Sequence, residues 1–247
     1  MRKINKILKI FLYLVIGVIT IAPIASSIYN RLGNCEIKGE IEGLGTQLAI
    51  VTGGSQANND TYKKYILVIN DKFSFHANYN KLGEGKMLTR DMLFKRANGS
   101  KFCMASKTIS YYIKENEKIA IKGHIDKYSV NYSITGNTLS EHQSRFKQAT
   151  LPYLVKETKI QIQLDSLNNI GAKCNTIDSL YNEYDKLRNR YNNKRLQYIR
   201  NNPTHIFSAH LLRCQHKDTI AKYLPSLSLE VLASLPGKEA KEMILTN

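Results

Sequence analysis

The sequence predicts an α+β protein, in which an N-terminal antiparallel β-sandwich or open barrel of about seven or eight strands is followed by an all-helical C-terminal region. Up to Gly136, short segments of alternating apolar and polar residues are separated by Gly, Asn and Asp, as is typical of antiparallel strands. Beyond Gly136 the apolar residues lie three and four apart, which is the period of an amphipathic helix. We therefore expect a signal peptide or signal anchor over 1–27, a β domain over 28–136 and a helical region over 137–247.

The N-terminal segment has the layout of an export signal. Basic residues precede an apolar run over 10–25, and small residues follow it. Cleavage is expected between Ser27 and Ile28. The run is shorter than the ~20 residues of a membrane-spanning helix, which favours cleavage, but an N-terminal membrane anchor stays open as an alternative. Either way, the basic flank places the remaining chain outside the cytoplasm, in the periplasm or cell envelope.

The segment Tyr65–Ala77 is predicted to be the hairpin around which the β domain is built. Asn70 and Asp71 tolerate the positive φ values that a two-residue turn requires. After the turn, Phe73 and Phe75 alternate with polar residues, the pattern of a half-buried strand. A lone hairpin is marginally stable in water, so we expect neighbouring strands to cover its phenylalanine face.

Other strands are expected on both sides of this hairpin. Their shared signal is alternation or β-branched and aromatic content between turn residues. The predicted strands are 35–43, 48–51, an irregular one within 87–96, a return strand from Phe102 after the Asn98–Gly99 turn, 109–113, 118–123 and 128–134. The Gly- and Asn-rich segments 52–64 and 79–86 are predicted to be loops.

The helical region is expected to begin with a capping box formed by Thr138 and Glu141. The first helix extends to about Asn169, with a kink at Pro152. The second helix has an apolar stripe at positions 177, 180, 184, 187 and 191. Its many basic residues are interpreted as a solvated face beside core tyrosines, with a phosphate-binding face as the alternative.

Further helices are expected beyond Asn202-Pro203. Thr204 is the predicted N-cap of the next helix. Pro225 and Pro236 are expected to divide the remaining tail into short helices, because proline cannot continue a helix that precedes it.

The chain is strongly basic, with 36 Lys and Arg against 20 Asp and Glu and a formal net charge of +16. Its lysines are spread along the sequence, which favours a solvated basic surface. Nucleic acid is not an expected partner, because export directs the chain away from it. Peripheral association of the basic second helix, near Arg190, with anionic lipid stays open as an alternative.

No pattern in the sequence predicts a catalytic residue, a cofactor, a metal ion or a defined small-molecule ligand. Phosphate-loop and Gly-x-Ser-x-Gly motifs are missing from the sequence. His205, His210 and His216 do not share the i, i+4 spacing that places two ligands on one helix face. The four cysteines include no Cys-x-x-Cys pair. Cys174 and Cys214 are the candidate disulfide in the helical region, with buried free thiols as the equal alternative.

The order of these segments resembles the uncharacterised β-rich N-terminal domain of envelope thiol-disulfide proteins of the thioredoxin-like (AhpC/TSA) type. The matching segments are Ile37–Gly43, Val68–Phe75, Tyr112–Ile119, Ile134–Asn137 and Tyr198–Pro203. The chain departs from the family at Lys72, where glycine is common. In that family a thioredoxin-like module with a Cys-x-x-Cys motif follows this region, whereas this sequence ends at Asn247.

The resemblance implies an accessory protein that binds an unidentified envelope partner, such as a separate thiol-disulfide redox protein, and is not itself an enzyme. The family's redox activity does not carry over to a chain that lacks the redox motif. The alternative is a thiol-redox protein that acts through its own cysteines, which would require a thiol of depressed pKa.

Overall fold

The computed structural model of the chain describes residues 33–55, 60–79, 82–96, 98–170 and 174–245. The export signal predicted for 1–27, with its cleavage between Ser27 and Ile28 and its apolar run 10–25, lies outside these ranges. Within them, no helix combines the length and the apolar character that crossing a lipid bilayer requires.

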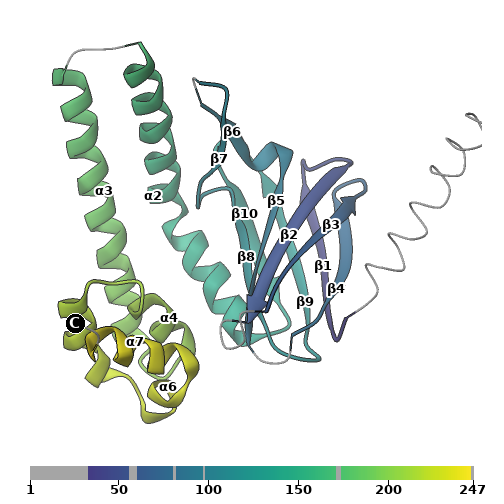
Figure 1. Cartoon of the computed structure of the whole chain (residues 1–247), viewed down its shortest axis with the longest axis vertical. Helices are drawn as coiled ribbons and strands as arrows, with labels where there is room; N and C mark the ends of the chain where they lie inside the picture. Colours follow the sequence, from purple (N-terminus) through teal and green to yellow (C-terminus); the bar gives the residue numbers. More distant parts are fainter. Residues whose placement is uncertain (1–32, 56–59, 80–81, 97, 171–173, 246–247) are drawn as a thin grey trace, which may run out of the picture.

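Two four-stranded sheets form an open sandwich at the N-terminal side of the molecule (Figure 1). Sheet A has the order β10-β9-β1-β4, sheet B has the order β3-β2-β5-β8, and β6 and β7 form a separate small hairpin. The strands are β1 (Cys35–Glu42), β2 (Gln47–Ser55), β3 (Asp60–Val68), β4 (Lys72–Ala77), β5 (Gly83–Thr89), β6 (Leu93–Lys95), β7 (Lys101–Cys103), β8 (Ile109–Ile113), β9 (Lys118–Ile125) and β10 (Val130–Thr135). All paired strands are antiparallel except β1 and β9.

The predicted α+β class is confirmed, with ten strands in the described residues where about seven or eight were expected, and without closure into a barrel. Alternate residues of both sheets meet in one core, which includes Ile37, Val51, Ile66, Phe75 and Tyr111. Each such side chain contributes roughly 1.5–3 kcal/mol when it leaves water, so this shared core holds the two sheets together.

The predicted turn at Asn70 and Asp71 is confirmed, because both residues have positive φ, 48° and 70°. The Asp71 carboxylate also accepts a hydrogen bond from the Gly45 backbone N–H at 2.6 Å. The strands on either side of the turn, however, separate after a single bridge between Ile69 and Lys72.

These strands belong to different sheets: β3 pairs with β2, and β4 pairs with β1. The predicted hairpin is therefore a link between the edges of the two sheets. Phe73 and Phe75 lie in the core between those sheets, as the alternation predicted.

Two segments predicted as loops are largely strand where the structure describes them. β2 continues through Gly53, and β5 begins at Gly83. A Cβ atom on Gly53 or Gly83 would collide with Tyr79, and one on Gly85 would collide with Tyr111. These glycines provide space for buried tyrosine rings, a tertiary requirement that local sequence patterns do not reveal.

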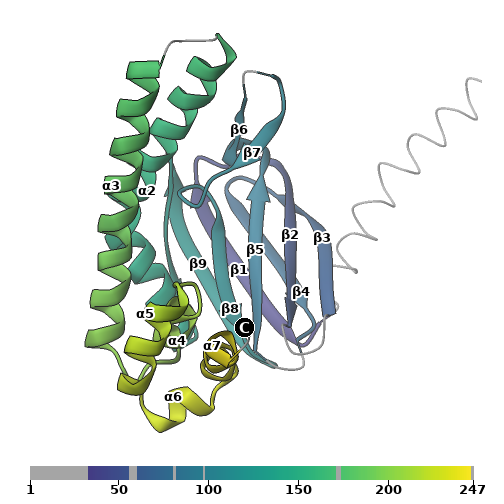
Figure 2. The ribbon, with the colours of Figure 1, turned by 60° about the vertical axis from the view of Figure 1, so that its left-hand side comes forward.

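Two long helices and four short ones follow the sandwich. They are α2 (Thr138–Asn169), α3 (Cys174–Asn201), α4 (Ile206–Leu212), α5 (Lys217–Tyr223), α6 (Leu229–Ala233) and α7 (Leu235–Leu245), with 3-10 turns at Arg90–Met92 and Leu224–Ser226. α2 and α3 lie side by side along the sandwich, and the short helices gather at the far end of α3 (Figure 2). α2 continues through Pro152, and Figure 1 shows it changing direction part-way along.

Two helices begin at caps other than the predicted ones. Asn137 caps α2 in place of Thr138, because its side-chain oxygen accepts the Ser140 N–H at 2.7 Å. Asn is also the better N-cap of the two. His205 caps α4 in place of Thr204, through Nδ1, which accepts the backbone N–H two residues on at 3.2 Å.

Side chains of α2 satisfy the open edges of β8 and β10. Ser140 Oγ accepts the Tyr112 N–H at 2.8 Å and donates to the Tyr112 carbonyl at 2.6 Å. One turn further, Ser144 Oγ accepts the Ile134 N–H of β10 at 3.1 Å. Unpaired edges of sheets are a liability in proteins, and here a helix takes the place of the missing strand. The helical region is thus bonded directly to the sandwich.

We expect Ser140→Ala to lower the free energy of unfolding by about 1–3 kcal/mol, because the buried Tyr112 N–H loses its partner. Urea denaturation followed by circular dichroism measures the change. Ser166→Ala, an exposed change on the same helix, is the matched control and should shift stability by less than about 0.5 kcal/mol. Equal effects of the two substitutions would contradict the role of the edge contact.

Candidate functional site

A cleft of about 470 Å³ lies between the outer face of sheet B and helices α2, α3 and α4. Its floor is formed by β5 and β8, where Glu84 lies opposite Tyr112 and Lys86 opposite Ser110. Tyr111, between the two β8 residues, faces the sandwich core instead. Strand alternation therefore assigns one face of β8 to the fold and the other to the cleft. The volume is in the range of small-molecule sites.

Aromatic rings form much of the wall of the cleft. Phe146 of α2 packs against Tyr191 of α3 and Phe207 of α4, with ring centroids 6.2 and 5.8 Å apart. On the other side, the ring of His210 lies 4.4 Å from that of Tyr112. These contacts give the cleft an apolar lining that comes from three helices and one strand.

Several buried polar atoms in this lining have no hydrogen-bond partner in the protein. They are Gln143 Oε1, Arg195 Nε and both ring nitrogens of His210, four of the six such side-chain atoms in the described residues. His210 is only 6% exposed. More than about 90% of buried polar groups in folded proteins are paired, and an unpaired one costs roughly 1–3 kcal/mol. Their concentration around one cleft makes it the candidate functional site.

Burial changes the protonation of two side chains in the cleft. Burial, together with the nearby Arg213 charge, lowers the pKa of His210 to about 3, so its imidazole is neutral at neutral pH. A neutral imidazole offers one N–H donor and one acceptor. Burial also lowers the pKa of Lys147 to about 7. The Lys147 ammonium donates to the Thr108 carbonyl and lies 4.5 Å from the centroid of the Tyr132 ring.

The one acidic residue that lines the cleft, among those described, is already engaged by cations. Glu84 Oε2 lies 3.8 Å from Arg213 Nη2, and Glu84 Oε1 lies 3.7 Å from Lys86 Nζ. Arg213 also forms an ion pair with Glu239. Lys147 and Arg195 have no carboxylate partner in the described part of the chain. Basic side chains therefore outnumber acidic ones in the lining of the cleft.

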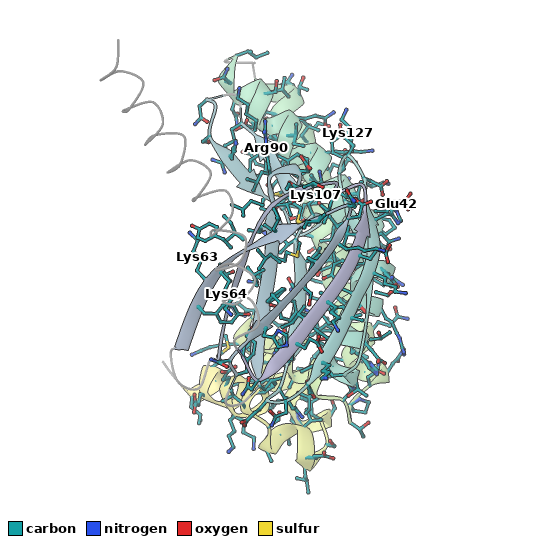
Figure 3. All side chains as sticks on the ribbon, turned by 90° about the vertical axis from the view of Figure 1, so that its right-hand side faces the viewer. Glu42, Lys63, Lys64, Arg90, Lys107 and Lys127 are labelled. Atoms are coloured by element: carbon teal, nitrogen blue, oxygen red, sulfur yellow. The ribbon has the colours of Figure 1, made fainter. Side chains whose placement is uncertain are left out.

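Most basic residues lie away from this cleft. Figure 3 shows Lys63 and Lys64 along β3 and a separate group, Arg90, Lys107 and Lys127, toward the opposite end of the sandwich. On α3 most of the basic side chains are exposed, as the solvated-face interpretation predicted. Arg195 is the exception, because its Nε is buried at the cleft.

The predicted Cys174–Cys214 disulfide is not formed, since Cys214 has a free thiol. Cys214 lines the cleft together with Tyr191, which lies about 26 Å along α3 from the backbone of Cys174. A disulfide requires Cα atoms within about 7 Å, so the length of α3 keeps the two cysteines apart. Cys35 is buried, and burial raises the pKa of its thiol.

The remaining residues singled out in the sequence lie elsewhere. Asn70, Asp71, Phe73 and Phe75 belong to the sandwich and not to the cleft. No group of three or more potential metal ligands occurs in the part of the chain that the structure describes.

Sequence reasoning missed Gln143 and Lys147 as members of a site. It considered Arg195 only as one basic residue of the second helix, and it rejected His210 as a metal ligand. A histidine inside the apolar segment Ile206–Leu212 was the one local signal of the site.

Comparison of the chain with protein-family models, with curated proteins and with solved structures finds no match.

Burial of His210 in its neutral form should make the protein less stable in mild acid. The pKa of His210 is about 3 in the fold and about 6.5 in the unfolded chain. As pH falls below about 6.5, the unfolded chain takes up a proton that the fold does not, so the free energy of unfolding decreases. Between pH 7 and 4.5 this contribution is on the order of 2 kcal/mol.

Urea denaturation gives the free energy of unfolding at pH 7 and at pH 4.5. In His210→Phe this free energy should decrease less between the two pH values than in the natural chain, by on the order of 2 kcal/mol. His216→Gln is the control, because His216 is exposed and its replacement should leave the loss unchanged. An identical pH dependence in His210→Phe and the natural chain would show that His210 is not buried in its neutral form.

Proposed function

We propose that this protein is an exported, non-enzymatic binding protein of the cell envelope, and that its binding site is the cleft between sheet B and the helices. The observation that carries the proposal is the set of unpaired buried atoms on Gln143, Arg195 and His210. Such atoms destabilise the free protein, and a ligand with complementary polar atoms would satisfy them. Export is supported by the layout of residues 1–27.

The hydrogen bonding of Cys214 and His210 favours binding over catalysis at the cleft. The thiol of Cys214 points to the His210 backbone carbonyl, 3.5 Å away. Both ring nitrogens of His210 lack a partner, so the thiol and the imidazole do not form the pair that activates a cysteine nucleophile. The resemblance to an accessory domain also supports a binding role, with a separate thiol-disulfide protein of the envelope as the proposed partner.

The alternative of a thiol-redox protein has less support. A disulfide exchange site needs an accessible thiolate and a second thiol close to it. The buried Cys35 has a raised pKa, which disfavours its thiolate. Cys214 is exposed, and none of the other described cysteines lines the cleft with it.

A substitution that fills the cleft should abolish binding of a small apolar probe. We expect the natural chain to bind one molecule of N-phenyl-1-naphthylamine, a neutral fluorescent compound, and Cys214→Trp to weaken this binding at least tenfold. Leu229→Trp is the control, because Leu229 is 86% exposed on α6, outside the cleft lining. Fluorescence titration gives the affinities, and thermal melts confirm folding. No binding by the natural chain, or equal binding by both variants, would rule out the cleft as the site.

The export proposal predicts a mature chain that begins at Ile28. Intact mass measurement of protein recovered from the envelope fraction of expressing cells should show the loss of residues 1–27. A full-length chain in the membrane fraction would instead support the anchor alternative. A full-length chain in the cytosol would contradict export.

A further inference from the structure

The charged groups of the cleft allow the proposed ligand to be assigned to a chemical class. Lys147 reaches the cleft from α2 and Arg195 from α3, so two cations approach one space from different helices. Their described contacts are neutral: Lys147 with the Thr108 carbonyl and the Tyr132 ring, and Arg195 with the Tyr191 ring, whose centroid is 4.6 Å from the guanidinium carbon. Both side chains are half-buried, and a cation that is partly withdrawn from water is stabilised when an anion pairs with it.

Two hydrogen-bond donors without a partner belong to the same lining. The neutral imidazole of His210 has an N–H without a partner, and Arg195 Nε–H is likewise free to donate. An anionic group placed between them would accept charge-assisted hydrogen bonds, which are the stronger kind. It would also favour the protonated form of Lys147, whose pKa burial lowers to about 7.

The rest of the lining is apolar and rich in rings. Phe146, Tyr191, Phe207 and Tyr112 enclose the space beside the cations, together with Leu154. Aromatic side chains favour stacked or edge contacts with other rings, so they fit a flat apolar body better than a long polar one. A free inorganic ion would leave this apolar surface in contact with water.

From this arrangement we infer that the cleft binds an organic anion, in which one carboxylate or sulfonate group is carried by an apolar body that contains rings. The anionic group lies between Lys147, Arg195 and His210, and the rings lie against the aromatic wall. This inference rests on the proposed function, because it specifies the ligand of the same cleft.

Two fluorescent probes that differ by one group provide the test. 1-Anilinonaphthalene-8-sulfonate has the ring system of N-phenyl-1-naphthylamine and adds a sulfonate. We expect Arg195→Gln and Lys147→Gln each to weaken binding of the sulfonate about tenfold or more, and binding of the neutral probe less than twofold. Arg195→Lys, which keeps a charge but loses the Nε–H, should have an intermediate effect and provides a milder variant if Arg195→Gln does not fold.

Three control variants separate the cleft from the surface. Arg190→Gln and Lys156→Gln remove exposed charges from the same two helices, and Leu67→Asn reduces the exposed apolar face of β3. All three should leave both affinities within twofold. Bound sulfonate should also slow alkylation of Cys214 by N-ethylmaleimide, measured by peptide mass spectrometry, since this thiol lines the cleft.

The outcomes distinguish the inference from the function on which it rests. If the cleft variants weaken both probes equally, or neither, while N-phenyl-1-naphthylamine still binds in the cleft, the anionic class is wrong and the binding proposal stands. If the surface variants weaken the sulfonate as much as the cleft variants do, the inference is overturned in favour of surface binding. If neither probe binds, both the inference and the proposed function fail.

Discussion

The open backbone edges of β8 and β10 are the constraint on which the rest of the structure depends. Ser110 and Tyr112 direct their N–H and C=O groups away from β5, and side chains satisfy them: the Tyr132 hydroxyl at Ser110 and Ser140 at Tyr112. Because these bonds have fixed positions, they set the register of α2 on the sandwich. Gln143 and Lys147, three and seven residues beyond Ser140, then project into the cleft. The hydrogen bonds of Ser140 to the edge strand β8 therefore also position the proposed site.

The cleft combines features that lower stability with a shape that suits a ligand. A tightly packed core would contain neither the unpaired His210 nitrogens nor a lysine such as Lys147, whose pKa is lowered by burial to about 7. Proteins retain such groups where function requires them, at some cost in stability. The apolar cores of the sandwich and of the helical cluster lie on either side of the cleft, and their burial offsets this loss of stability.

The basic character of the chain has two separate origins in the structure. Most lysines and arginines lie on the surface, where their charges are solvated and screened by salt. Lys64 and Lys107 are buried in the sandwich. Lys147 and Arg195 differ from all of these because both line one concave space. The net charge of +16 therefore does not identify a ligand. The position of Lys147 and Arg195 in one cleft is the basis for inferring an anionic one.

Local patterns in the sequence determined the class of the fold: two-residue alternation up to Gly136, helical spacing after it, and a turn at Asn70 and Asp71, residue types that tolerate positive φ. Only the tertiary structure decided which strands pair, because β3 and β4 are adjacent in the chain but lie in different sheets. It also decided that glycines such as Gly53 lie in strands, beside tyrosines distant in sequence. Only the tertiary structure formed the cleft as well, because its residues come from separate strands and helices. The single local sign of it was a histidine within the apolar segment Ile206–Leu212.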